Sequence, residues 1–154
     1  MGENMFTNKY NLIESKELKL KILETVKDKY SSDLLPFYYY EILDKNNNSV
    51  GIISLKIGYN EYTIYNGNIN CQIKHEYRGS NYSLKAMKLL KPLIQFHNIH
   101  SVILVIDEFN TASNKIAIKA NGKLIGKLKV QKSYSSHIRE DLFKNVYLIN
   151  PNDW

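Results

Sequence analysis

The chain has 154 residues, a formal net charge of +6 and one cysteine, with 44% hydrophobic and 23% charged residues. A length near 150 residues is typical of one domain, and the composition excludes a disordered, collagen-like or disulfide-framed chain. We therefore expect residues 1–154 to form a single domain.

The positive charge comes almost entirely from lysine, because only Arg78 and Arg139 are arginines. Arginine is the side chain that binds guanine and phosphate with two parallel hydrogen bonds, so nucleic acid is not favoured as a partner. The sequence has no signal-peptide pattern and no apolar run of about 18 residues. These features predict a cytoplasmic protein with no membrane partner.

The first third of the chain contains a predicted helix and a predicted β-hairpin. Apolar residues recur at helical spacing after Ser15, a favourable N-cap, and predict a helix over roughly 16–31. The aromatic and apolar stretches 37–43 and 50–57 flank a cluster of turn-forming residues. This pattern favours two paired strands.

A second hairpin is predicted directly after the first. Strand-forming residues at 62–65 and 69–73 flank the pair Asn66-Gly67. This pair is typical of a type I′ turn between antiparallel strands.

Helices and strands alternate in the second half of the sequence. A helical pattern over 82–93 should be interrupted at Pro92. The apolar run 101–106 has the length of a strand covered on both faces, and 110–121 is predicted to be a helix with Gly122 as its C-terminal cap. Two further strands are expected at 124–130 and 143–149, with a loop at 132–141.

This order of elements predicts an α+β (mixed αβ) domain with a central mixed, mostly antiparallel sheet flanked by helices. A loop connects the strand that ends at Ile73 to the helix that begins near Asn81. Free N–H groups and the helix dipole make such a loop an anion site of pyrophosphate size. Gly79 and Asn81 are suited to positive φ in this loop. A simple strand-to-helix turn is the alternative interpretation of the loop taken alone.

The run Tyr-Arg-Gly-Ser-Asn-Tyr-Ser at 77–83 resembles motif A of the GNAT acetyltransferase superfamily, although Glu76 and Asn81 depart from its strict pattern. Downstream, 107–116 resembles the strand-end Asp followed by Asn-x-x-Ser-x-Lys of that family, and 119–124 resembles its Gly-Lys-Leu entry into the next strand. The resemblance covers roughly 37–131. It implies a GNAT-like fold with a strand–loop–helix pyrophosphate site.

The resemblance also implies acetyl-CoA as cosubstrate and no metal. It assigns the backbone of 78–83 to the pyrophosphate, Asn110 to the pantetheine arm, and Lys115 or Lys85 to the terminal phosphate. The simpler interpretation of each lysine is a solvated helix residue. The expected coenzyme-binding residues are Gln72, Ile73, Arg78, Gly79, Ser80, Asn81, Tyr82, Ser83, Asn110, Ser113 and Lys115.

Transfer to an amine needs an oxyanion donor, a proton acceptor and a proton for the departing thiolate. The resemblance implies free backbone N–H groups on the strand at 70–73 as the donor. It also implies a strand Glu and a helix Tyr for the two protons, but 68–72 has no carboxylate and Ala117 stands at about the Tyr position. The nearest substitutes for the base are Glu61, His75 and Glu108, each of which could instead be a solvated or capping residue. The nearest substitute for the acid is Ser113, whose hydroxyl could instead bond back to a backbone carbonyl of its helix. We name Ser113 and Glu108 as candidate catalytic residues.

Three other patterns receive structural interpretations. Cys71 could accept an acyl group, but it fits a small buried strand residue. His97 and His100 have no partner at metal-ligand spacing, and 122–128 is one residue short of a P-loop.

Together, the residues and the resemblance predict an N-acetyltransferase that moves an acetyl group from acetyl-CoA to a primary amine by direct attack. The acceptor is a small molecule or a peptide that the sequence does not identify. A cationic acceptor would need an acidic patch from Glu61, Asp107 and Glu108. Tyrosines could line its pocket or pack in the core: Tyr38, Tyr39, Tyr40, Tyr59, Tyr62 and Tyr65.

Two further options stay open at this point. The alternative function is that of a catalytically inactive GNAT-fold module, either an acyl-CoA-binding module or a regulatory one. A homodimer formed through the C-terminal strands would be common for such an architecture.

Overall fold

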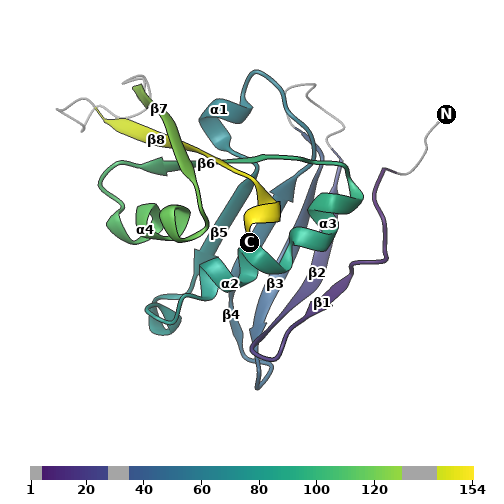
Figure 1. The fold of residues 1–154 in the computed structure, drawn as a ribbon. Coiled ribbons are helices and arrows are strands. Elements are labelled where there is room, and N and C mark those ends of the chain that lie inside the picture. The colour runs from purple at the N-terminus through teal and green to yellow at the C-terminus, as the bar shows by residue number, and fades with distance from the viewer. Residues whose placement is uncertain (1–4, 28–34, 130–141) are drawn as a thin grey trace.

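A computed structural model describes residues 5–27, 35–129 and 142–154 (Figure 1). Its strands are β1 (Leu12–Glu14), β2 (Leu18–Val26), β3 (Phe37–Asp44), β4 (Ser49–Lys56), β5 (Ile69–Ile73), β6 (Val102–Asp107), β7 (Lys123–Lys129) and β8 (Phe143–Ile149). Its α-helices are α1 (Thr63–Asn66), α2 (Tyr82–Leu89), α3 (Lys91–Phe96) and α4 (Thr111–Lys119). Two 3₁₀ helices, η1 (His75–Tyr77) and η3 (Pro151–Asp153), complete the described elements.

The strands form two antiparallel sheets. Five strands follow one another in the order β1-β2-β3-β4-β5, and three more take the order β6-β8-β7. Helices α2 and α3 lie over the five-stranded sheet, and α4 lies against the three-stranded one (Figure 1). The predicted α+β class is confirmed, with two antiparallel sheets in place of one central mixed sheet.

The core lies between the five-stranded sheet and the helices above it. Along β3, buried and half-buried residues alternate strictly, because successive side chains of a strand point to opposite faces. Tyr38, Tyr40 and Ile42 are fully buried on the inner face, and Leu90 and Leu93 cover them from the helical layer. β3 pairs antiparallel with β4, with Phe37 opposite Lys56, so the predicted hairpin over 37–57 is confirmed.

The predicted helix over 16–31 is wrong where the structure describes it. Residues 18–26 form β2, which pairs with β3 and sets Leu20 opposite Ile42. Leu18 and Leu20 are buried and Lys19 between them is not, so a period of two coexists with the helical spacing. An available partner strand decides between the two patterns, since strand pairing depends on neighbours more than on local preference. Residues 28–31 lie outside the described ranges.

The predicted second hairpin is also wrong. Thr63–Asn66 is a short helix, which ends at Gly67 with φ of 71°, and β5 pairs with β4 instead. The Thr63 hydroxyl oxygen accepts a hydrogen bond from the Asn60 N–H at 2.9 Å, which closes the turn that precedes the helix.

The second half follows the prediction more closely. Pro92 lies in the first turn of α3, where its missing N–H costs no hydrogen bond, and it separates α3 from α2. Asn110 caps α4, and Asn121, with φ of 61°, takes the left-handed position that we assigned to Gly122. β6 is buried on one face and half-buried on the other, rather than covered on both. The strands at 124–129 and 143–149 are confirmed, and the predicted loop at 132–141 lies outside the described residues.

The two sheets meet at the start of β5 and β6. The Asn68 N–H donates to the Ile103 carbonyl at 2.7 Å, and the Ile103 N–H donates to Asn68 Oδ1 at 2.8 Å. Gly67 is needed at this junction, since a Cβ there would lie 2.8 Å from the Ile103 carbonyl oxygen. Beyond this junction the two strands belong to different sheets, and the space between them forms the candidate site.

Candidate functional site

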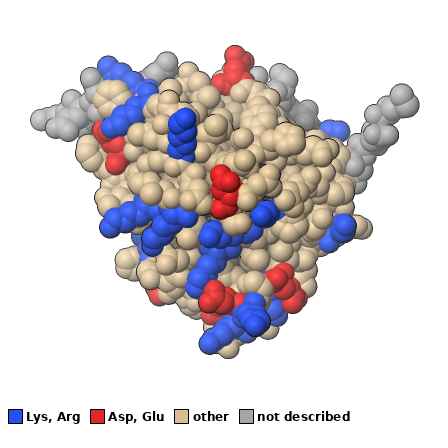
Figure 2. All heavy atoms as spheres, in the orientation of Figure 1, with Lys and Arg blue, Asp and Glu red and all other residues tan. Residues whose placement is uncertain are grey.

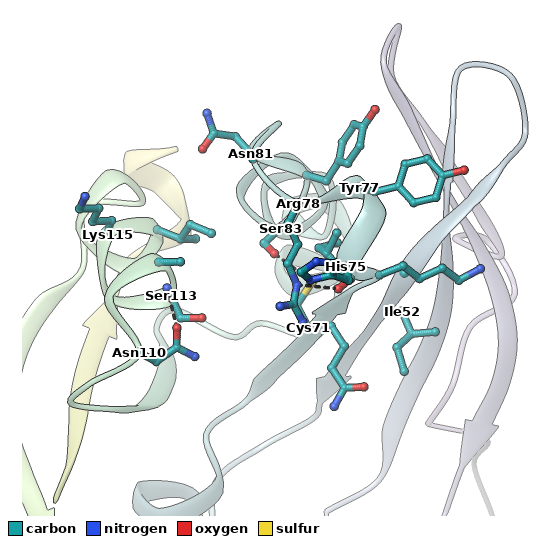
Figure 3. Close-up of a pocket in the computed structure, with 18 of the residues that line it drawn as sticks. Ile52, Cys71, His75, Tyr77, Arg78, Asn81, Ser83, Asn110, Ser113 and Lys115 are labelled. Carbon is teal, nitrogen blue, oxygen red and sulfur yellow. Dashed lines mark hydrogen bonds between the residues drawn. The ribbon is translucent and has the colours of Figure 1, made fainter.

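Two connected cavities begin where the sheets part. The smaller, of about 520 Å³, lies between β5 and β6 and is called the gap below. It opens into a cleft of about 890 Å³ between β5 and α2 on one side and α4 on the other (Figure 3). Both are lined by Cys71, Gln72, Ser83, Asn110, Ser113 and Ile116.

The loop before α2 forms one wall of the cleft. Gly79 has φ of 95° with no heavy atom within 4 Å of its Cβ position, and Asn81 is left-handed with φ of 57°. Arg78 Nε donates to the Ile73 carbonyl at 3.3 Å, which ties the loop to the end of β5. Within the described chain, the backbone N–H groups of 79–84 have no hydrogen-bond partner. The loop thus presents free donors at the positive end of a helix.

Helix α4 forms the opposite wall, and a network around Asn114 holds it on the three-stranded sheet. Asn114 Oδ1 accepts hydrogen bonds from Asn145 Nδ2 at 2.9 Å and from the Tyr147 hydroxyl at 2.7 Å. Asn114 Nδ2 donates to the carbonyls of Asn110 and Asp107. Sequence reasoning missed Asn114, because the β8 residues that it binds are 31 and 33 positions away.

Lysines surround the mouth of the cleft. Lys115 lines it as expected, whereas Lys85 pairs with Glu17 at 3.0 Å and is absent from its lining. Lys119 also lines the cleft, and its Nζ donates to Asn81 Oδ1 at 3.3 Å across the opening. Figure 2 shows basic side chains over α4 and over α2 on this face. We did not predict Lys119, although it follows Lys115 by four residues and so shares its helix face.

The structure brings most of the predicted coenzyme-binding residues together. Ser80, in the middle of the loop, does not line the cleft. The cleft lining includes Gln72, Ile73, Arg78, Gly79, Asn81, Tyr82, Ser83, Asn110, Ser113 and Lys115.

The two candidate catalytic residues differ in position. Ser113 lies half-buried where the cleft meets the gap, and its hydroxyl makes no hydrogen bond to any other described residue. Glu108 lines neither cavity and pairs instead with Lys127 at 3.2 Å. Of the other base candidates, His75 lies on the loop side of the cleft and Glu61 lines neither cavity.

Cys71 lies on β5 at the meeting of the two cavities. Burial raises the pKa of its thiol to about 11, and its Sγ lies 3.6 Å from Ser83 Oγ. A thiol needs its deprotonated form to attack, so this side chain is a poor nucleophile near neutral pH.

The tyrosines divide between the core and the surface. Tyr38 and Tyr40 are fully buried, whereas Tyr59, Tyr62 and Tyr65 are exposed around α1. Tyr39 is half-buried on β3.

His97 lies against the core, where its Nε2 is 2.8 Å from the Tyr38 hydroxyl, which itself accepts from the Thr7 N–H. Among the described residues, no three His, Cys, Asp or Glu side chains come close enough to hold a metal ion together. In the same ranges, no helix combines the length and the apolar character needed to cross a membrane.

No family model and no curated protein matches the sequence. The structure resembles ribosomal-protein-S5-alanine acetyltransferase from Vibrio fischeri, with a TM-score of 0.65 and 14% identity over 93% of this chain and 98% of that one. A GNAT-family acetyltransferase from Bacillus anthracis gives 0.57 and 21% over 74% and 66% of the two chains. The microcin C7 self-immunity acetyltransferase MccE, solved with acetyl-CoA and AMP, gives 0.57 and 17% over 74% and 61%. The chain therefore has the GNAT acetyltransferase fold, which confirms the resemblance at the level of the fold.

Proposed function

We propose that this protein is an N-acetyltransferase that transfers an acetyl group from acetyl-CoA directly to a primary amine. One observation carries the proposal: free N–H groups at the start of α2 flank a cleft that leads into the gap between the sheets. A long cosubstrate with an anionic end and a reactive end matches this combination.

The anionic end would bind at the loop. Free backbone donors and a helix dipole favour a pyrophosphate, and Gly79 leaves space for its close approach. Lys115 and Lys119 lie on the neighbouring helix, where their ammonium groups would bind a further phosphate. These residues would bind the anionic end of the cosubstrate and thereby orient the rest of it.

The reactive end would lie beside β5. In an antiparallel pair, alternate residues direct their N–H and C=O groups toward the partner strand. The Lys74 N–H donates to the Val50 carbonyl of β4, so the N–H groups of Cys71 and Ile73 point away from β4. Such donors would stabilise the negative charge that develops on the thioester oxygen. Ser113 would supply a proton to the departing thiolate.

Coenzyme binding can be tested without knowing the acceptor. Acetyl-CoA at 100 times its Kd should stabilise the protein by about 2.7 kcal/mol, which raises Tm by about 5–11 °C. Gly79→Val should remove this shift, because the side chain would occupy the approach to the loop and disfavours positive φ. Gly126→Val is the matched control, since Gly126 has equally open space on β7 but no positive φ. An unchanged shift in Gly79→Val would contradict the assignment of the loop.

A second candidate is an acyl-CoA-binding module without catalysis. It is favoured by the lack of any carboxylate on β5 and by the burial of Ala117 where related folds were expected to hold a tyrosine. This candidate predicts the same thermal shift but no release of CoA thiol with any amine. Thiol release well above the rate of hydrolysis would eliminate it.

A further inference from the structure

We propose that Asp107 is the general base of this site and accepts the proton that the acceptor amine loses in the gap between β5 and β6. The inference rests on the proposed acetyl transfer and names the residue that the sequence left unassigned. It also implies the face of the molecule from which the acceptor enters.

Asp107 is the only carboxylate among the described residues that line the cleft or the gap. It ends β6, directly across the gap from the edge strand β5. Within the described ranges its carboxylate has no hydrogen-bond or ion-pair partner, unlike that of Glu108, which Lys127 engages. A carboxylate is ionised at neutral pH and can then accept a proton.

The orientation of Asp107 follows from the pairing of β6 with β8. Side chains of Asn145 and Tyr147 on β8 bind Asn114, so this face of the sheet is turned toward α4. Lys144 and its cross-strand partner Asp107 belong to the opposite face, because successive side chains alternate along a strand. The carboxylate therefore enters the gap from the face away from the coenzyme cleft.

Two consequences follow for the acceptor. An amine that enters from the face away from α4 reaches the thioester without crossing the cosubstrate, which permits direct transfer. Lys144 lines the same gap as Asp107 and repels a second positive charge. Lys144 therefore disfavours an acceptor that carries further positive charge close to the reacting nitrogen, whereas the Asp107 carboxylate attracts that nitrogen.

The proton balance of the step is complete. The acceptor ammonium first releases one proton to solvent through Asp107, which frees the nitrogen lone pair. The lone pair then forms the C–N bond, and the carbonyl electrons move onto oxygen beside the N–H groups of β5. The nitrogen, now cationic, loses one proton to Asp107. The carbonyl then re-forms, the C–S bond breaks, and the departing thiolate takes a proton from Ser113. Asp107 returns its proton to Ser113 through solvent, so one amine proton ends on the CoA thiol.

The test compares Asp107→Asn with Asp107→Glu and with Glu24→Gln, an exposed control on β2. Release of CoA thiol is measured with acetyl-CoA and a panel of primary amines: a peptide with N-terminal alanine, a peptide with N-terminal serine, a polyamine and free amino acids. We expect Asp107→Asn to lower kcat about 100- to 10,000-fold while its Kd for acetyl-CoA stays within about twofold. Asp107→Glu should recover part of the rate, and Glu24→Gln should match the wild type.

The pH profile separates a base from a merely structural residue. Between pH 7 and 10 the rate of Asp107→Asn should rise more steeply than that of the wild type, because solvent then deprotonates the amine. If Asp107→Asn acetylates an amine at the wild-type rate, Asp107 is not the base, and the proposed function stands. A wild type that binds acetyl-CoA but acetylates no amine would overturn the proposed function, and the base assignment with it.

Discussion

Asn68 holds the two sheets together at the point from which the gap opens. Its side chain is fully buried, and its Oδ1 accepts from the Ile103 N–H at 2.8 Å while its Nδ2 donates to the Gly58 carbonyl at 3.0 Å. Asn68→Ala leaves both of these backbone groups without a partner. The backbone bond from the Asn68 N–H to Ile103 survives, so the variant isolates the contribution of the side chain.

A buried donor or acceptor left unsatisfied costs about 1–3 kcal/mol, so two should cost about 2–6 kcal/mol. For a chain of this length each kcal/mol shifts Tm by about 2–4 °C, so we expect a fall of about 4–24 °C. Asn70→Ala, at an exposed position on β5 two residues further along, should change stability by less than about 0.5 kcal/mol.

Urea unfolding of the variants provides the measurement. Asn68→Asp keeps the acceptor for Ile103 but sets a carboxylate oxygen against the Gly58 carbonyl, so it should be at least as destabilised as Asn68→Ala near neutral pH. Acetyl-CoA affinity should also fall in both variants, since the junction determines the width of the gap. If Asn68→Ala lowers the free energy of unfolding by less than about 0.5 kcal/mol, water reaches the two freed backbone groups. That result would refute the argument from burial.

Burial lowers the pKa of His97, so below about pH 6.5 the unfolded chain binds a proton that the folded protein does not. Tm should therefore fall as the pH drops from 7 to 5, and thermal melts should show a shallower fall for His97→Phe; parallel curves would contradict this. Replacing Lys115 and Lys119 together by alanine should weaken binding of CoA about tenfold more than that of dephospho-CoA, because only the former carries the extra phosphate. Calorimetric titration of both ligands checks this, with exposed Lys88→Ala on α2 as the control.

Local sequence patterns were sufficient where neighbouring residues determine the structure. The aromatic and apolar run at 37–43 predicted β3, and the helical pattern at 110–121 predicted α4. The same reasoning failed at 16–31, where Leu18, Ile22 and Val26 recur at helical spacing while Leu18, Leu20 and Ile22 also fit a strand. Only the pairing of β2 with β3 resolves that ambiguity, and the pairing is a long-range interaction.

The candidate site divides in the same way. The sequence by itself determined the loop at 78–83, because its glycine, its left-handed asparagine and the helix that follows are consecutive in the chain. Only the tertiary structure decided that Lys119 bridges the cleft and that Asp107 faces the gap. Both depend on which face of α4 or β6 turns toward a distant segment, and packing between the two sheets sets that orientation.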